Sequence, residues 1–220
     1  MFNLIRKDLL AQKHYLWFAL GYSVFVFLAF SKPIFLPFVY IMGSVAIAYV
    51  MVLSAIQTEY INKSDIVLLS LPVQRREVVI SKYLAIFLFT FAALAFMATV
   101  GLAIKLSPLP FTVRLIQWQD IVITIISVML MAAIYFPLYY KVEGKWVQAL
   151  NIIVFMLLFF APANIINYLS QNQHSNWVTV LLQISSQRPW LIPLLGVVIG
   201  LVILAVSLVI SLRIYERKDF

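Results

Sequence analysis

The sequence predicts an all-α integral membrane protein with six transmembrane helices, an interfacial helix at the N-terminus, and both termini in the cytoplasm. Of the 220 residues, 64% are hydrophobic and 11% are charged. A soluble globule of this length exposes a large share of its residues and could not hide so much apolar surface. The charged residues also gather between apolar runs, which are near the roughly 20 residues needed to cross a bilayer. These two features exclude a soluble fold.

The first element is the segment of residues 1–14. It carries Phe2, Ile5 and Leu9 on one stripe at helical spacing, with charged residues on the other sides. This pattern favours a moderately amphipathic helix that lies on the membrane surface. We expect it on the cytoplasmic side, directly before the first span.

Six apolar runs follow, and prolines and charged residues mark several of their ends. Pro33 closes the turn after the first run, because proline disfavours helix in the residue before it. Pro137 is predicted to end or kink the fourth span near its inner face, and Pro162 to break the fifth near its outer end. The expected spans are residues 15–30, 34–56, 83–104, 121–140, 146–166 and 190–212.

The loop of residues 167–189 is the longest external stretch that we expect. Its residues 177–182 form an apolar patch that is too short to cross a bilayer. The patch either lies on or dips into the outer surface, or belongs to an ordinary extracellular loop.

The distribution of basic residues sets the orientation. With the N-terminus inside, Lys32, Lys105, Arg114 and Arg188 are external, and the other twelve of the 16 Lys and Arg residues are internal. Basic residues concentrate on the cytoplasmic side of membrane proteins. This rule places the loop of residues 57–82 in the cytoplasm.

Several functions are disfavoured by what the sequence lacks. It has no cysteine, and its two histidines, His14 and His174, have no carboxylate at a metal-binding spacing, so we expect no metal site. The expected spans contain no Asp, Glu, Lys, Arg or His, which argues against an ion-coupled carrier and an intramembrane enzyme. The net charge of +8 sits at span ends, where it meets anionic lipid rather than nucleic acid.

No phosphate-binding loop of the GxxxxGK[ST] type occurs in the chain. Any uphill transport therefore needs a second polypeptide that binds ATP and Mg²⁺, and we expect no cofactor in this chain. Polar uncharged residues within the spans are predicted to make helix–helix hydrogen bonds rather than to bind substrate. They include Ser23, Ser44, Ser54, Thr90, Thr99, Thr124, Ser127, Asn151, Asn164 and Ser207.

The loop of residues 57–82 holds seven of the chain's 24 charged residues around an apolar strip at residues 66–71. Such a loop either only connects two helices or forms a docking surface. Its residues 70–77 read SLPVQRRE, and residues 78–83, VVISKY, lead straight into an apolar helix. Together with residues 3–10, NLIRKDLL, and 214–220, IYERKDF, this phrase resembles small type-two ABC exporter permeases. It is most similar to permeases of staphylococcal amphipathic-peptide (phenol-soluble modulin) exporters.

The resemblance implies a permease subunit of the bacterial plasma membrane that exports a hydrophobic or amphipathic cargo. It also implies a separate ABC ATPase subunit and a second permease chain, most simply as a homodimer. In such exporters the ATPase binds a short coupling helix, which we place between residues 59 and 71. The alternative is a non-transporting assembly or sensor subunit that docks a cytoplasmic partner through the same loop. The expected coupling residues are Glu59, Asp65, Ile66, Leu68, Leu69, Leu71, Pro72, Arg75, Arg76, Glu77 and Lys82.

Overall fold

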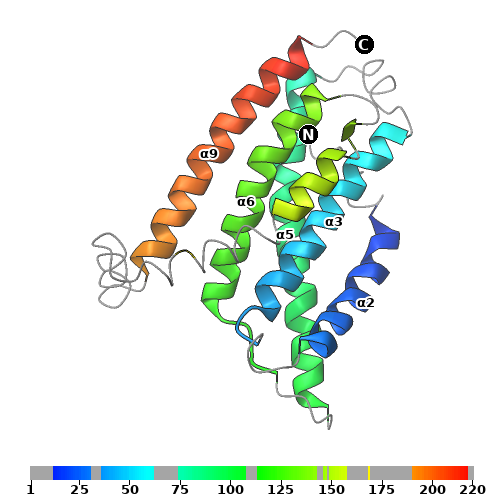
Figure 1. Ribbon diagram of the computed structural model, residues 1–220, viewed down its shortest axis with the longest axis vertical. Coiled ribbons are helices and arrows are strands. Elements are labelled where there is room, and N and C mark those ends of the chain that lie inside the picture. The colour runs from blue at the N-terminus through cyan, green and yellow to red at the C-terminus, as the bar shows by residue number, and fades with distance from the viewer. Residues whose placement is uncertain are drawn as a thin grey trace. The chain divides into compact units, whose positions relative to one another are not determined.

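The computed structural model describes residues 12–30, 36–61, 74–107, 113–142, 146–147, 149–157, 168 and 190–217. The regular secondary structure in these residues is helical, which confirms the predicted all-α class for this part of the chain (Figure 1). Residues 146–147 and 149–157 are helical within the expected fifth span. The other helices are α2 (Lys13–Ala29), α3 (Val39–Ile61), α5 (Arg75–Leu106), α6 (Trp118–Lys141) and α9 (Leu191–Glu216).

Four of these helices, α3, α5, α6 and α9, are long and apolar enough to cross a membrane, and α2 is a shorter apolar helix. Several predicted features lie outside the described residues. They are most of the interfacial helix (residues 1–11), the middle of the central loop (62–73), the end of the fifth span with Pro162 (158–166), and the external patch (177–182).

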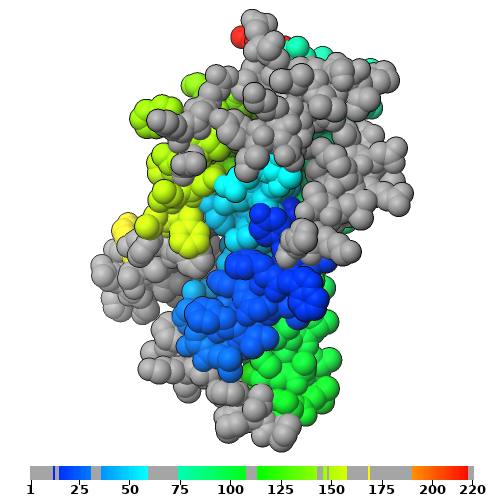
Figure 2. Space-filling model, turned by 90° about the vertical axis from the view of Figure 1, so that its right-hand side faces the viewer, coloured from blue at the N-terminus to red at the C-terminus, as the bar shows by residue number. Residues whose placement is uncertain are grey.

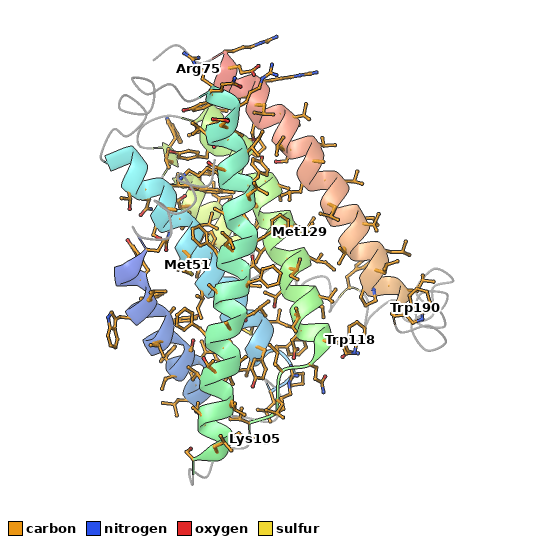
Figure 3. The ribbon with its side chains drawn as sticks, turned by 180° about the vertical axis from the view of Figure 1, so that it is seen from behind. Met51, Arg75, Lys105, Trp118, Met129 and Trp190 are labelled. Carbon is orange, nitrogen blue, oxygen red and sulfur yellow. The ribbon has the colours of Figure 1, made fainter. Side chains whose placement is uncertain are left out.

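Helix α5 is longer than a membrane span requires. Its 32 residues extend to about 48 Å at 1.5 Å per residue, whereas the hydrocarbon of a bilayer is about 30 Å thick. Figure 3 shows Arg75 and Lys105 at its two ends. Glu77 in the first turn and Lys105 in the last turn match the helix dipole. At least one charged end therefore projects beyond the hydrocarbon.

Helices α3, α5, α6 and α9 all continue past the ends expected from the sequence, which were residues 56, 104, 140 and 212. Helix α3 runs to Ile61 instead of residue 56, because Gln57 to Tyr60 contain no helix breaker and Thr58 donates a hydrogen bond to the Ser54 carbonyl. Helix α6 continues through Pro137 to Lys141. Pro137 therefore does not end the fourth span.

The chain divides into two compact units, residues 1–128 with 215–220 and residues 129–214. In the first unit, α2, α3 and α5 pack against one another. The side chain of Gln12 donates to the Met51 carbonyl, and Phe27 packs edge-on against Tyr40, so α2 and α3 are antiparallel. Figure 2 shows the outward face of α2, in blue, against α3 and the C-terminal part of α5.

Two glycines allow α5 to approach its neighbours closely. A Cβ atom at Gly43 would overlap the end of the Met97 side chain, and one at Gly101 would overlap the Tyr40 hydroxyl and touch the Phe27 ring. Small residues have this role where membrane helices pack closely. Both contacts pair an early position of α3 with a late position of α5, so these helices are also antiparallel.

In the second unit, a serine compensates for the proline inside α6. Pro137 has no N–H, so it cannot donate to the Ala133 carbonyl four residues earlier. The Ser207 hydroxyl of α9 donates to that carbonyl at 2.7 Å, in a buried position. Hydrocarbon offers no water to such a group, so the bond satisfies the carbonyl internally. The prediction that Ser207 bonds between helices is confirmed.

A second bond between helical segments joins Tyr135 of α6 to Asn151, with 2.9 Å between the Tyr135 hydroxyl and Oδ1. Ser23, Ser54, Thr90 and Thr99 instead bond carbonyls of their own helices. Helix α9 buries Gly200, Leu204, Ser207 and Ser211. Its other faces expose large apolar side chains, as expected of a helix that meets lipid or another chain.

Candidate functional site

The structure describes part of the expected coupling site. Asp65, Ile66, Leu68, Leu69, Leu71 and Pro72 lie outside the described residues. Glu59 belongs to the last turns of α3, and Arg75, Arg76, Glu77 and Lys82 lie on α5. Helices α3 and α5 therefore flank residues 62–73, which lie outside the described residues. The expected coupling helix, which we started at residue 59, begins on a backbone that is still part of α3.

The start of α5 is defined by Gln74. This residue is extended, with φ −70° and ψ 139°, and its carbonyl accepts a bond from the Glu77 amide at 2.9 Å. Helical geometry therefore begins at Arg75. In the first turn, Arg75 is half-buried and Arg76 is exposed.

Both arginines contact Glu216, the last residue of α9, and we call these three residues the C-terminal latch. The Arg76 Nε donates to Glu216 Oε1 at 2.6 Å. The Arg75 Nη1 donates to the Glu216 carbonyl at 3.1 Å. The sequence predicted these arginines only as coupling residues at the end of the loop of residues 57–82. The partner seen here lies 140 residues away along the chain, and no local pattern could have indicated it.

Lys82 lies two turns further along α5 and is only 6% exposed. Helical spacing explains its burial, because Val79, Lys82, Tyr83 and Ile86 fall on one face and all four are buried. The sequence predicted Lys82 as a coupling residue at the end of the loop of residues 57–82. Its apolar neighbours at i−3, i+1 and i+4 were the signal that could have placed it inside.

A second charged cluster, which sequence reasoning missed, lies at the N-terminal end of α3. Arg114 Nη1 and Nη2 donate to the two carboxylate oxygens of Asp120 at 2.7 and 2.6 Å. The same guanidinium donates to the carbonyls of Leu36 at 2.9 Å and Pro37 at 2.6 Å. It also lies over the Tyr40 ring, 5.3 Å from the centroid. We call these residues the Arg114 clamp.

The clamp is closed by two further bonds. The Tyr40 hydroxyl donates to the Arg114 carbonyl at 2.8 Å, and the Gln117 amide donates to Asp120 Oδ2 at 2.9 Å. The side chain of Asp120 is 5% exposed and that of Arg114 is 23% exposed. An arginine fork that meets a carboxylate in this way is a strong, directional contact. The clamp therefore joins the turn before α3 to the start of α6.

The sequence carried only a weak signal for the clamp. Arg114 counted as one of four external basic residues, and Asp120 directly precedes the expected span of residues 121–140. Asp120 in the first turn of α6 suits the helix dipole, and a basic residue six positions earlier is a plausible partner. The carbonyls of Leu36 and Pro37 lie 78 and 77 residues earlier along the chain and could not be inferred.

Among the described residues, no group of three or more His, Cys, Asp or Glu side chains could hold a metal ion. The charged residues of these clusters are instead paired with one another or with carbonyls. The arrangement can therefore fix helix ends, and none of these contacts provides acid–base or metal chemistry.

Comparison with protein families gives a match over residues 3–216 to a family described as "ABC-2 family transporter protein". Comparisons with curated proteins and with solved structures found no match. The match covers nearly the whole chain, including all the described helices. ABC-2 permeases are multi-pass membrane subunits without an ATPase site, and they generally pair with an ABC ATPase. The match therefore confirms the resemblance at the level of the family: this chain belongs to the ABC-2 family of transporter permeases.

Proposed function

We propose that this permease subunit exports a hydrophobic or amphipathic cargo, driven by ATP hydrolysis in a separate subunit that binds ATP and Mg²⁺. The observation that carries the proposal is the absence of Asp, Glu, Lys, Arg and His from the expected spans in a chain of this family. An uncharged, aromatic-rich pathway suits an amphipathic peptide, a lipid or a lipophilic drug better than a small ion.

The ATPase subunit docks on the loop of residues 57–82, according to this proposal. Helices α3 and α5 carry the two ends of that loop, and α5 is longer than a membrane span. The charged first turn of α5 favours a position of this helix end outside the hydrocarbon. The apolar strip at residues 66–71 would then enter a cleft on the ATPase.

The test of docking is co-purification of the ATPase subunit encoded with this permease. In the variant Leu68→Asp/Leu69→Asp, an unpaired charge would enter the cleft, and a charge buried without a partner is costly. We expect ATPase recovery to fall at least about tenfold, which corresponds to roughly 1.4 kcal/mol. Gln74→Asp is the matched control, because it adds acidic charge at an exposed N-cap, where Asp is favoured. If the double variant keeps the ATPase and transport, the docking surface lies elsewhere.

We further propose that two permease chains, most simply identical, enclose the pathway between them. A single set of six helices leaves little room for a bulky amphipathic cargo. Crosslinking in native membranes should trap a permease dimer at wild-type expression levels. Full ATP-linked transport by a species that stays monomeric would contradict a shared pathway.

The proposed orientation has both termini in the cytoplasm, because twelve of the 16 basic residues are then internal. A reporter fused after Phe220 or inserted within residues 61–64 should report a cytoplasmic position. A reporter within residues 171–175 should report an external one. An external signal from the Phe220 fusion would overturn the six-span arrangement.

A further inference from the structure

Two neighbouring arginines at the start of α5 share one residue at the end of α9. Arg76 binds the Glu216 side chain at 2.6 Å, and Arg75 binds the Glu216 backbone carbonyl at 3.1 Å. The last carbonyls of a helix have no partner within the helix, and a cation is favoured near this end by the helix dipole. Glu216 therefore binds the two arginines with both its carboxylate and its backbone carbonyl at the helix terminus.

The contact is fixed on the α9 side. Tyr215, directly before Glu216, is 4% exposed, so the backbone that carries the acidic side chain is packed. On the α5 side, Val78 and Val79 are buried within one turn of the arginines. The latch therefore lies between two packed helix ends, and the loop of residues 62–73 joins α5 directly before it.

The latch contributes little to stability. The side chains of Arg76 and Glu216 are 68% and 38% exposed, and exposed ion pairs of this kind are screened by water and salt. A pair that adds little stability can still decide the direction in which a helix end points. This contrast separates a positioning role from a structural one in an experiment.

We propose that Glu216 is a positioning residue for coupling to the ATPase: it holds Arg75 and Arg76, so that the end of the docking loop and the end of α9 move together. The proposal rests on the function proposed above, in which residues 57–82 receive the ATPase. Force applied to the loop then reaches α9 at Glu216 as well as α5.

The first measurement reports the latch directly. The chain has no cysteine, so cysteines introduced at the exposed positions Gln74 and Arg217 are the only thiols of the permease. A bifunctional maleimide should join them efficiently in native membranes, both with and without the ATPase subunit bound. Glu216→Arg should lower the crosslinking rate about threefold to fivefold, within the range of exposed pairs. The charge exchange Arg76→Glu/Glu216→Arg should restore it.

The second measurement reports coupling. Glu216→Arg should lower ATPase recovery by a similar factor, the charge exchange should restore it, and Glu216→Gln should fall between them. The melting temperature should stay within about 2 °C of wild type in all three variants, since surface substitutions change stability little. A purely structural role would predict the reverse, a lower melting temperature with unchanged recovery.

Three results would overturn the proposal. They are wild-type crosslinking in Glu216→Arg, wild-type ATPase recovery in that variant, or failure of the charge exchange to restore either quantity. The docking variant Leu68→Asp/Leu69→Asp separates the two proposals, because it should lose the ATPase and keep crosslinking between residues 74 and 217. If the wild-type permease retains no ATPase, the proposed docking fails, and the crosslinking series alone decides whether Glu216 positions α5.

Discussion

Removing the carboxylate of Asp120 should damage the protein more than any change at the C-terminal latch. In Asp120→Ala, the Arg114 guanidinium loses both carboxylate bonds, and the Gln117 amide loses its acceptor. Two backbone carbonyls and the Tyr40 ring still contact the cation. The charge itself stays, on a side chain that is 23% exposed.

The cost follows from this geometry. Breaking a buried ion pair by removing one partner costs about 3–5 kcal/mol, because the other charge stays buried. The partial exposure of Arg114 and its remaining carbonyl partners reduce that penalty to about 2–3 kcal/mol. For a chain of this length, this destabilisation corresponds to a fall of roughly 4–12 °C in melting temperature. Arg114→Lys should cost less, since lysine keeps the charge but cannot form the fork.

The assay is thermal unfolding of the purified permease in one detergent, followed by the loss of monodisperse protein on size exclusion. Glu216→Ala is the matched control, because it removes an acidic side chain from an exposed arginine pair and should leave the melting temperature nearly unchanged. A melting temperature for Asp120→Ala within about 1 °C of wild type would refute the reasoning, since the loss of a buried ion pair should lower the free energy of unfolding by more than such a shift allows.

Two further predictions concern helix packing. Gly101→Ala should destabilise the permease by about 1–3 kcal/mol, because the new methyl group would overlap the Tyr40 side chain. Gly21→Ala should be neutral or stabilising, because nothing lies within 4 Å of the added atom. Thermal unfolding of both variants checks this prediction, and equal effects would contradict it. Ser207→Ala should lower the free energy of unfolding by about 0.6–1.7 kcal/mol. The loss should be smaller in the background Pro137→Ala, because residue 137 then supplies its own N–H. Additive effects in this double-mutant cycle would contradict the prediction and show that the two sites are independent.

The helices were largely predictable from the sequence because the bilayer imposes a simple requirement. A run of about 20 apolar residues must be helical to satisfy its backbone in hydrocarbon, and α3, α5, α6 and α9 each contain such a run. The ends were less predictable. Residues 57–60 are polar, and a polar residue is compatible with a helix that leaves the membrane as well as with a loop. Hydropathy marks where the hydrocarbon ends, and α3 continues beyond that point.

The charged contacts were not predictable for a different reason. Hydropathy treats Arg76, Lys82 and Arg114 alike, as residues that a span must avoid. Their surroundings differ: Arg76 is exposed, Lys82 is buried on a helix face, and Arg114 is held by carbonyls 77 and 78 residues earlier. Lys82 could have been placed by helical periodicity alone. The partners of Arg76 and Arg114 depend on how distant parts of the chain pack, which a single sequence does not specify.

The two charged clusters differ in a way that bears on transport. Arg114 joins the turn before α3 to the start of α6 through a network of hydrogen bonds in which Asp120 is almost fully buried. Glu216, in contrast, contacts α5 through an exposed ion pair. Salt at about 1 M shortens the screening length to about 3 Å and weakens exposed pairs far more than buried ones. High salt should therefore reproduce the effect of Glu216→Arg on ATPase recovery while leaving the penalty of Asp120→Ala in place. Under the proposed docking, a buried clamp at the start of α3 and an exposed latch at the start of α5 would confine ATP-driven movement to the end of α5 that follows the loop of residues 57–82.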